Sequence, residues 1–196
     1  MYIVDKQQSN ITVHANESQE YLFICDGSKQ FDVTVSLESE GASARIYGLV
    51  LGSDDNICDV SVTVQHLAPH TISEIMIIGA VGGEAKAKIK SKIYIAPNAY
   101  GSNGREEIRT LLLSKNASAY STPELQIENN DVQCSHAVST THIDDEKKFY
   151  LESRGFDEKE SKQAVVHGHF APLLEKIIDE SLRISTQCLL TEKYDF

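Results

Sequence analysis

The first two thirds of the chain alternate between apolar and polar residues, with turn residues between the alternating segments. Turn signals such as EGAS, GSDD and VGGE bound segments that are rich in β-branched residues. Eight such segments lie at residues 31–37, 44–51, 59–65, 73–79, 87–95, 108–114, 123–129 and 131–137. No helical pattern of the usual crossover length separates them, which argues against a Rossmann fold or a (β/α) barrel. The pattern predicts a mainly β fold, either a sandwich or a β-helix.

The spacing of the strands favours a β-helix only in part. IYGLVL, EIMIIG, KIYIAP and TLLLSK begin at residues 46, 74, 92 and 110, and the two later spacings are close to one coil of a solenoid. A narrow stacked interior also requires small residues, and these recur in or beside the strands: Ala42, Ala44, Gly48, Ala85, Ala87, Ala117 and Ala119. The first spacing is longer and does not fit this period, so the pattern leaves both folds open.

The pattern changes to helical at Asp144. DDEKKFYLESRG has acidic residues in its first turn and Gly155 after its last, the polarity expected of a helix. A second helix is predicted to start with a capping box of Asp157 and Glu160 and to end at Gly168. A third, with Pro172 in its first turn, presents one apolar face made by Phe170, Leu173, Leu174, Ile177 and Ile178. We therefore expect a β body over residues 1–142 and a helical domain over residues 143–196.

Charge and composition narrow the class of partner. The formal net charge of the 196 residues is −11, which argues against binding to nucleic acid or to anionic membranes. The first residues, MYIVDKQQSN, lack the features of a signal peptide, and no apolar run is long enough to span a membrane. The four cysteines are scattered, as free thiols of a reducing compartment are. These features predict a cytoplasmic protein.

Candidate chemistry is concentrated at Cys134 and His136. Residues two apart in a strand point to the same face, about 6.6 Å apart, so a thiol and an imidazole can converge on one metal. Two ligands are too few for a structural zinc or iron–sulfur site, and His142 lies beyond the predicted strand. Spacing alone therefore favours a packing role for both residues. His66 and His70, at a corner between strands, are expected to bond to backbone, and no nucleotide-binding motif is present.

Several segments taken together resemble the SufB/SufD family of iron–sulfur cluster assembly proteins. They are VQHLAPHTISE, LLLSKNASAYSTPELQIENNDVQCSHA and IDDEKKFYLESRGFDEKESKQAVVHGHF, over roughly residues 60–182. Cys-Ser-His at residues 134–136 is similar to the SufD branch. The sequence departs from the family at Ala137, where a glycine is usual, and the long helical region that usually precedes this part is missing.

The resemblance implies a right-handed parallel β-helix with a C-terminal helical domain. It also implies a complex with SufB and the ABC ATPase SufC. His136 and its neighbour Cys134 match residues at the assembly interface, where an iron–sulfur cluster is held transiently and none is stably bound. The helices from about Asp157 to Leu182 match those that dock SufC, so the apolar face from Phe170 to Ile178 is the expected docking surface. We expect a homodimer in isolation and a heterodimer with a SufB-type chain in the cell.

Two functions remain to be compared. The first is a non-enzymatic scaffold subunit for cluster assembly. The second is a carbohydrate-active enzyme, because parallel β-helices also host lyases. Such an enzyme needs clustered carboxylates near basic residues, and the strand lysines Lys86, Lys88, Lys90 and Lys92 are expected to lack paired acids. The sequence therefore favours the scaffold.

Overall fold

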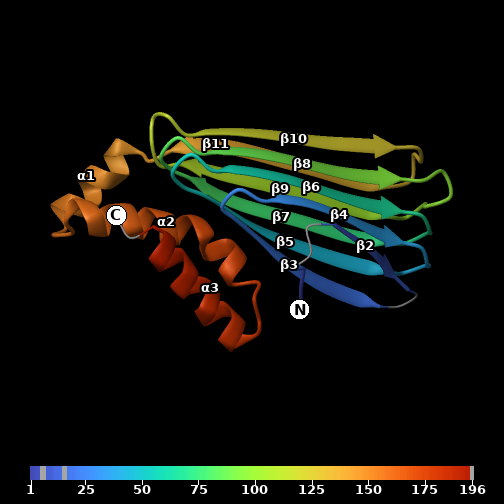
Figure 1. Ribbon diagram of the computed structural model, residues 1–196. Helices are drawn as coiled ribbons and strands as arrows, with labels where there is room; N and C mark the ends of the chain where they lie inside the picture. The colour runs from blue at the N-terminus through green and yellow to red at the C-terminus, as the bar shows by residue number, and fades with distance from the viewer. Residues whose placement is uncertain (5–7, 15–16, 195–196) are drawn as a thin grey trace.

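The chain winds into a solenoid of two parallel β-sheets, with three helices packed at one side (Figure 1). The computed structural model describes residues 1–4, 8–14 and 17–194. The six-stranded sheet contains β1 (Tyr2–Ile3), β3 (Ser18–Asp26), β5 (Ser43–Gly52), β7 (Ile72–Val81), β9 (Asn103–Leu112) and β11 (Gln133–His142). The five-stranded sheet contains β2 (Gln8–Val13), β4 (Gln30–Leu37), β6 (Ile57–His66), β8 (Lys86–Ile95) and β10 (Ser118–Ile127). Successive strands alternate between the sheets, so two strands make one coil, and the mainly β solenoid predicted from the sequence is confirmed.

The length of a coil differs from the predicted one. Ile46 pairs with Ile75, and Ile75 pairs with Glu106, so a coil takes 29 to 31 residues here. The predicted period was wrong because it compared strands of opposite sheets: the segments at 74, 92 and 110 belong to β7, β8 and β9. The longer first spacing, which seemed to break the period, joins β5 to β7 and is close to one complete coil.

Alternate side chains of both sheets fill the interior of the solenoid. Val33, Val62, Ile46 and Ile75 are among the residues buried there. The interior is so narrow that a large aromatic ring leaves no space for a side chain on the strand beside it. The Phe23 ring lies over Gly48, where an added Cβ would meet the ring Cζ at 2.2 Å. A side chain at position 48 would therefore displace Phe23.

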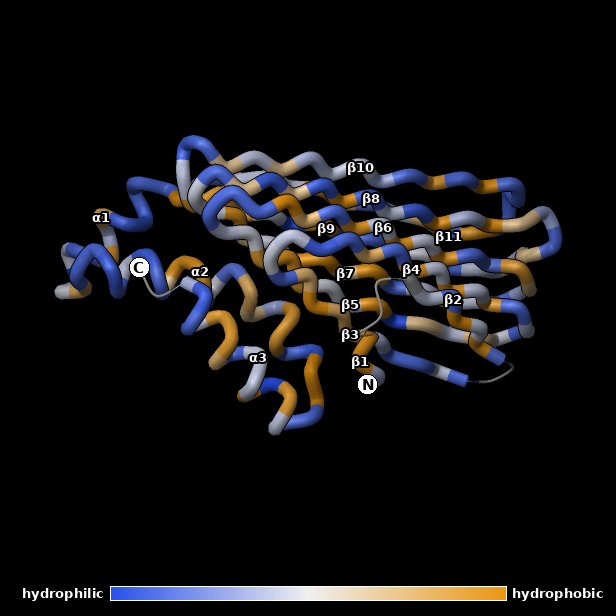
Figure 2. Tube along the Cα trace, viewed as in Figure 1, coloured by the Kyte–Doolittle hydropathy of each residue, from blue (hydrophilic) through white to orange (hydrophobic). Residues whose placement is uncertain are grey.

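The helical tail covers the outer face of the six-stranded sheet. It consists of α1 (Asp145–Ser153), α2 (Glu158–Leu174) and α3 (Glu180–Lys193). Hydrophobic residues of α2 and α3 face β3, β5 and β7 (Figure 2), and they form a second core together with Leu22, Tyr47, Leu49, Met76 and Ile78. Because both faces are covered there, the second halves of β5 and β7 are continuously buried, while β6 and β8 alternate.

The helix boundaries confirm two predictions and correct two others. Asp144 caps α1, and Asp157 and Glu160 form the predicted capping box at the start of α2. However, α2 continues through Gly168 and contains Pro172 well inside it. Burial of its apolar side against the sheet outweighs the local cost of glycine and proline. The final helix, α3, was not predicted as a separate element.

Four of the five predicted docking residues are buried within the chain. Phe170, Leu173 and Ile177 have no exposed surface, and Leu174 is 5% exposed, because all four pack in the core between the tail and the sheet. Ile178 lies beyond this contact and is 83% exposed. The apolar face recognised in the sequence is therefore mainly the interface between the tail and the solenoid, and only Ile178 is accessible to a partner.

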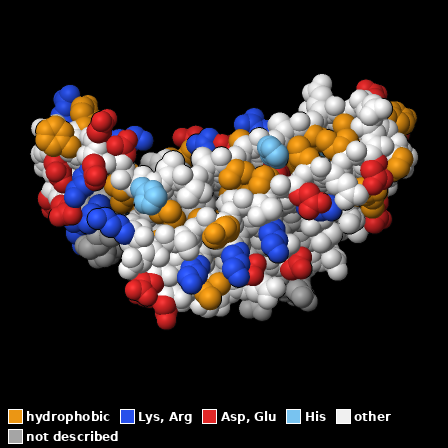
Figure 3. All heavy atoms as spheres, turned by 90° about the horizontal axis from the view of Figure 1, so that it is seen from above, with side chains coloured by type: hydrophobic (Ala, Val, Ile, Leu, Met, Phe, Trp, Pro, Cys, Tyr) orange, Lys and Arg blue, Asp and Glu red, His pale blue; other side chains and the backbone are white. Residues whose placement is uncertain are grey.

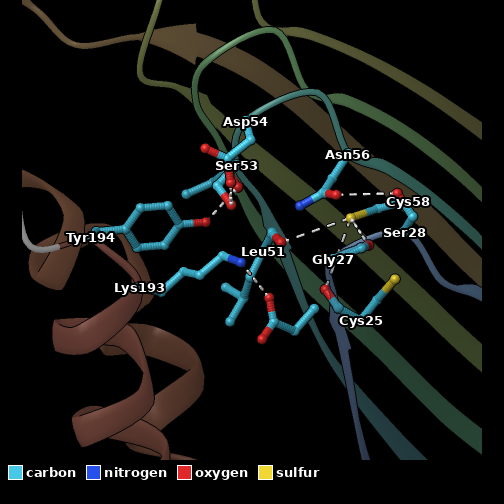
Figure 4. Close-up of polar contacts among 12 residues, drawn as sticks. Cys25, Gly27, Ser28, Leu51, Ser53, Asp54, Asn56, Cys58, Lys193 and Tyr194 are labelled. Atoms are coloured by element: carbon cyan, nitrogen blue, oxygen red, sulfur yellow. Dashed lines mark hydrogen bonds and ion pairs between the residues drawn. The ribbon is translucent and has the colours of Figure 1, made fainter.

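Polar contacts fix the end of α3 to the early coils (Figure 4). Lys193 Nζ lies 2.7 Å from the Asp26 carboxylate at the end of β3. The Tyr194 hydroxyl donates to the carbonyl oxygen of Ala80 at the end of β7, over 2.7 Å. Cys25 and Cys58 lie fully buried beside this corner.

His66 forms a buried polar corner between β6 and β7. Its ring nitrogens lie 2.8 Å from the hydroxyls of Thr71 and Ser73, so its partners are side chains and not the backbone expected from the sequence. Burial lowers the pKa of His66 to about 4. His70, in contrast, adopts a positive φ of 56° and contacts the Tyr100 ring edge to face.

Replacing Phe170 with Ala is expected to lower the free energy of unfolding by about 3–5 kcal/mol, because it empties a fully buried position between the tail and the sheet. The matched change Ile178→Ala, at an exposed position, is expected to stay within about 0.5 kcal/mol of the parent. Urea unfolding measures both variants. Equal effects would contradict this packing of the tail.

The His66→Gln variant is expected to change how stability depends on pH. Between pH 6.5 and about 4, the unfolded chain binds a proton at His66 that the folded chain does not, so the parent loses stability as the pH falls. The advantage of the parent over the variant should shrink by about 3 kcal/mol across this range. Urea unfolding at several pH values measures it, and a constant difference would show that His66 is not held neutral.

Candidate functional site at the open end of the solenoid

The last coil of the solenoid ends in two uncovered strands. β10 pairs only with β8, and β11 pairs only with β9, so both strands form free sheet edges. In β11 every residue except Cys134 is exposed. Seen from above (Figure 3), hydrophobic side chains lie along this side of the molecule, with histidine side chains among them. Free edges of this kind are available for pairing with another chain.

Cys134 and His136 lie two residues apart on β11, where the register places them beside Gly104 and Glu106 of β9. Cys134 packs partly against the interior core, and its Sγ lies 3.4 Å from where a Cβ of Gly104 would stand. Burial raises the pKa of the Cys134 thiol above its ordinary value. The His136 side chain is 50% exposed. The two donors therefore lie at the open end, one partly inside the solenoid and one at its surface.

His142 does not join them. It ends the same strand, six residues further on, which corresponds to about 20 Å along an extended chain. There it lines a cleft with Leu111, Lys147 and His169, next to the helical tail. Within residues 1–4, 8–14 and 17–194, no group of three or more His, Cys, Asp and Glu side chains is placed to hold a metal ion.

Glu106 is a member of the site that the sequence reasoning missed. It pairs with His136 in the neighbouring strand and is fully buried. Ser91 donates a hydrogen bond of 2.8 Å to Glu106 Oε2, whereas Oε1 has no hydrogen-bond partner and lies 3.8 Å from His136 Nδ1. Burial raises the pKa of Glu106 to about 7. The signal was a glutamate at an inward position, but the predicted strand began only at Ile108.

The arrangement offers a sulfur, a nitrogen and an oxygen donor at one end of a rigid scaffold. Imidazole and thiolate are ligands for iron and for iron–sulfur clusters. The residues that the structure describes supply no set of four ligands, so a cluster here needs further ligands from elsewhere.

None of the helices among the described residues is both long and apolar enough to cross a membrane.

Comparison with known proteins identifies the family of the chain. Residues 4–169 match the family model described as "SUF system FeS cluster assembly, SufBD core domain". The chain is 29% identical over 152 residues to the iron–sulfur cluster assembly protein SufD of Escherichia coli, which covers 78% of this chain and 36% of that protein. It is 31% identical to a SufBD family protein of Mycobacterium leprae, covering 76% of this chain and 40% of that one. The SufD of Bacillus subtilis is 25% identical, over 81% of this chain and 36% of the relative.

The chain therefore spans less than half the length of these curated relatives. The family match nevertheless extends over most of the chain and includes β2 to β11, α1 and most of α2. The chain belongs to the SufBD family of the SUF iron–sulfur cluster assembly system.

Proposed function

We propose that this chain is a non-enzymatic scaffold subunit of the SUF machinery, on which iron–sulfur clusters are assembled. One observation carries the proposal: a chain of the SufBD family places Cys134 and His136 together at the uncovered last coil of its solenoid. The cluster is the cargo of this site and is held only transiently. A cytoplasmic location, where thiols stay reduced, is part of the proposal.

The donors from this chain are completed by a second chain. The free edge of β11 is the surface to which we assign a SufB-type partner, because an edge strand offers unpaired backbone groups along its length. That partner supplies the remaining ligands opposite His136. In isolation a second copy of this chain takes the same place, which gives a homodimer with two cysteines and two histidines at the interface.

His136 is the more important of the two donors in this proposal. A neutral imidazole binds iron less tightly than a thiolate does, and weaker binding suits a site that must release its product. Cys134, in contrast, is partly buried beside Gly104 and contributes a sulfur ligand once its proton is removed.

A carbohydrate-active enzyme is not supported. The comparisons match assembly proteins, and the outer face of β8 carries lysines and not clustered carboxylates. One expectation about these lysines was wrong, because Lys92 Nζ lies 2.7 Å from Glu124 on β10. This is a single exposed ion pair between neighbouring strands, which contributes about 1 kcal/mol or less.

The helical tail is the proposed docking region for a SufC-type ATPase. Since Phe170 and its neighbours are buried, the accessible apolar surface lies elsewhere on the tail. The surface that we assign consists of Phe149, Tyr150 and Phe156, which are 71%, 56% and 44% exposed and lie on α1 and just before α2. Ile178 is a separate exposed apolar residue, beyond the other end of α2. Exposed aromatic residues grouped in this way are typical of protein interfaces.

The His136→Ala variant is expected to fold and to associate with its partners normally, because the side chain is half exposed. Cluster formation in the reconstituted complex should be lost. Iron and sulfide analysis, with the visible absorption of the cluster, measures this. His142→Ala is the matched control, since it removes a histidine from the same strand outside the site. A His136 variant that assembles clusters as well as the parent would refute the assignment.

Phe149→Ala is expected to weaken binding of a SufC-type ATPase by about tenfold or more, as loss of a central aromatic residue in an interface usually does. Calorimetric titration measures the affinity, and Ile178→Ala tests the remaining predicted docking residue. Tyr120→Ala, at an exposed aromatic residue of β10, is the control and should leave the affinity unchanged. Unaltered binding in both tail variants would place the ATPase elsewhere.

A further inference from the structure

Glu106 occupies a position that is apolar in the preceding coils. Ile46, Ile75, Glu106 and His136 stack on one another along the interior of the six-stranded sheet. All of them except His136 are fully buried. Burying a carboxylate in such a column costs several kcal/mol of desolvation free energy. Hydrogen bonds to its oxygens reduce this cost, and an oxygen without a partner does not. Packing alone therefore gives no reason for a glutamate here.

In the opposite sheet, the interior residue that faces Glu106 is also polar and not apolar. Val33, Val62 and Ser91 stack along the interior of the five-stranded sheet, so a hydroxyl replaces valine exactly one coil before the open end. Ser91 donates to Glu106 Oε2 over 2.8 Å and so holds the carboxylate in one orientation. The other oxygen, Oε1, is turned toward His136 and remains buried without a hydrogen bond.

The gap between Glu106 Oε1 and His136 Nδ1 is 3.8 Å, which is too long for a hydrogen bond. It suits a cation that binds both atoms at an open angle, because bonds from first-row metals to carboxylate oxygen and imidazole nitrogen are each about 2.0–2.2 Å. The remaining coordination positions face the exposed end of the solenoid, where His136 is half exposed. A metal can therefore enter and leave without opening the fold.

We propose that Glu106 and His136 form a loading site for ferrous iron, with the buried Glu106 carboxylate as a ligand supplied by the solenoid itself. The choice of iron rests on the proposed function, in which iron is cargo. The donor types agree with it, since a carboxylate combined with imidazole binds Fe²⁺ in many proteins. The site holds the ion beside Cys134, on the strand that carries both His136 and the thiol.

Binding of ferrous iron alone to the full chain tests this site. Competition with a chromogenic chelator, under anaerobic conditions, gives the affinity. We expect Glu106→Gln and His136→Ala each to weaken iron binding by at least about tenfold. The loss of affinity in the double variant should differ from the sum of the two single losses, because the two ligands act on one ion. Glu107→Gln and His142→Ala are the controls: Glu107 is the adjacent carboxylate, which accepts a hydrogen bond from Arg109 outside the interior.

Thermal unfolding checks that each variant is folded. Glu106→Gln preserves the shape of the side chain, and Glu106→Asp, which withdraws the carboxylate by one methylene, is a second variant that should also bind iron less tightly than the parent. Parental iron affinity in Glu106→Gln overturns the inference, whatever its cluster yield. Parental cluster formation in His136→Ala overturns the proposed function, while a measured loss of iron binding in Glu106→Gln still supports the iron site. The two failures are therefore distinguishable.

Discussion

Parallel pairing between successive coils is the constraint on which the rest of the structure depends. Each strand between the two ends of a sheet satisfies its backbone N–H and C=O groups through the coil before it and the coil after it. The interior can then be only as wide as two facing layers of side chains, so residues such as Gly48 must leave room for a ring from the preceding coil. From β5 to β11 the paired strands are offset by 29 to 31 residues, and the ladder makes each interior position one of a column of stacked residues.

The columns explain why the site lies where it does. Interior positions of the middle coils are closed above and below, and a polar group there has no access to water. The last coil has nothing above it, so polar side chains can be placed at its level and just beneath it. Ser91 and Glu106 appear at that level, and Cys134 and His136 lie in the final strand. The free edge and the donor atoms are two results of the same ending of the solenoid.

Much of this could be predicted from alternation along the chain. The strands from β4 to β11 were located because their interior positions are apolar and their outer positions polar. β2 and β3 were not predicted: β2 reads QSNITV, which is largely polar, and β3 has continuous apolar residues in the middle, where the tail covers its outer face. The extent of α2 could not be predicted, since contacts with the sheet maintain the helix across Gly168 and Pro172.

Only the site residues of a single strand, β11, could be predicted from the sequence. Spacing of two residues placed Cys134 and His136 on one face, but the partner of His136 lies 30 residues away and is defined by register. Local sequence does not specify register between coils, so Glu106 and the orienting Ser91 could be recognised only from the stacked columns. In the same way, the apolar face of Phe170 was correctly identified as apolar, but its cover is the chain's own sheet.

The contact of the last helix with the first coils has a consequence for synthesis. Lys193 pairs with Asp26, and Leu22 of β3 lies in the same core as Leu190 and Tyr194. A growing polypeptide leaves the ribosome from its N-terminus, so the early coils emerge long before the helix that shields them. Until α2 and α3 have emerged, Leu22, Tyr47 and Met76 remain accessible to chaperones and to other nascent chains. Emergence of α3 from the ribosome is thus the event that allows this second core to form.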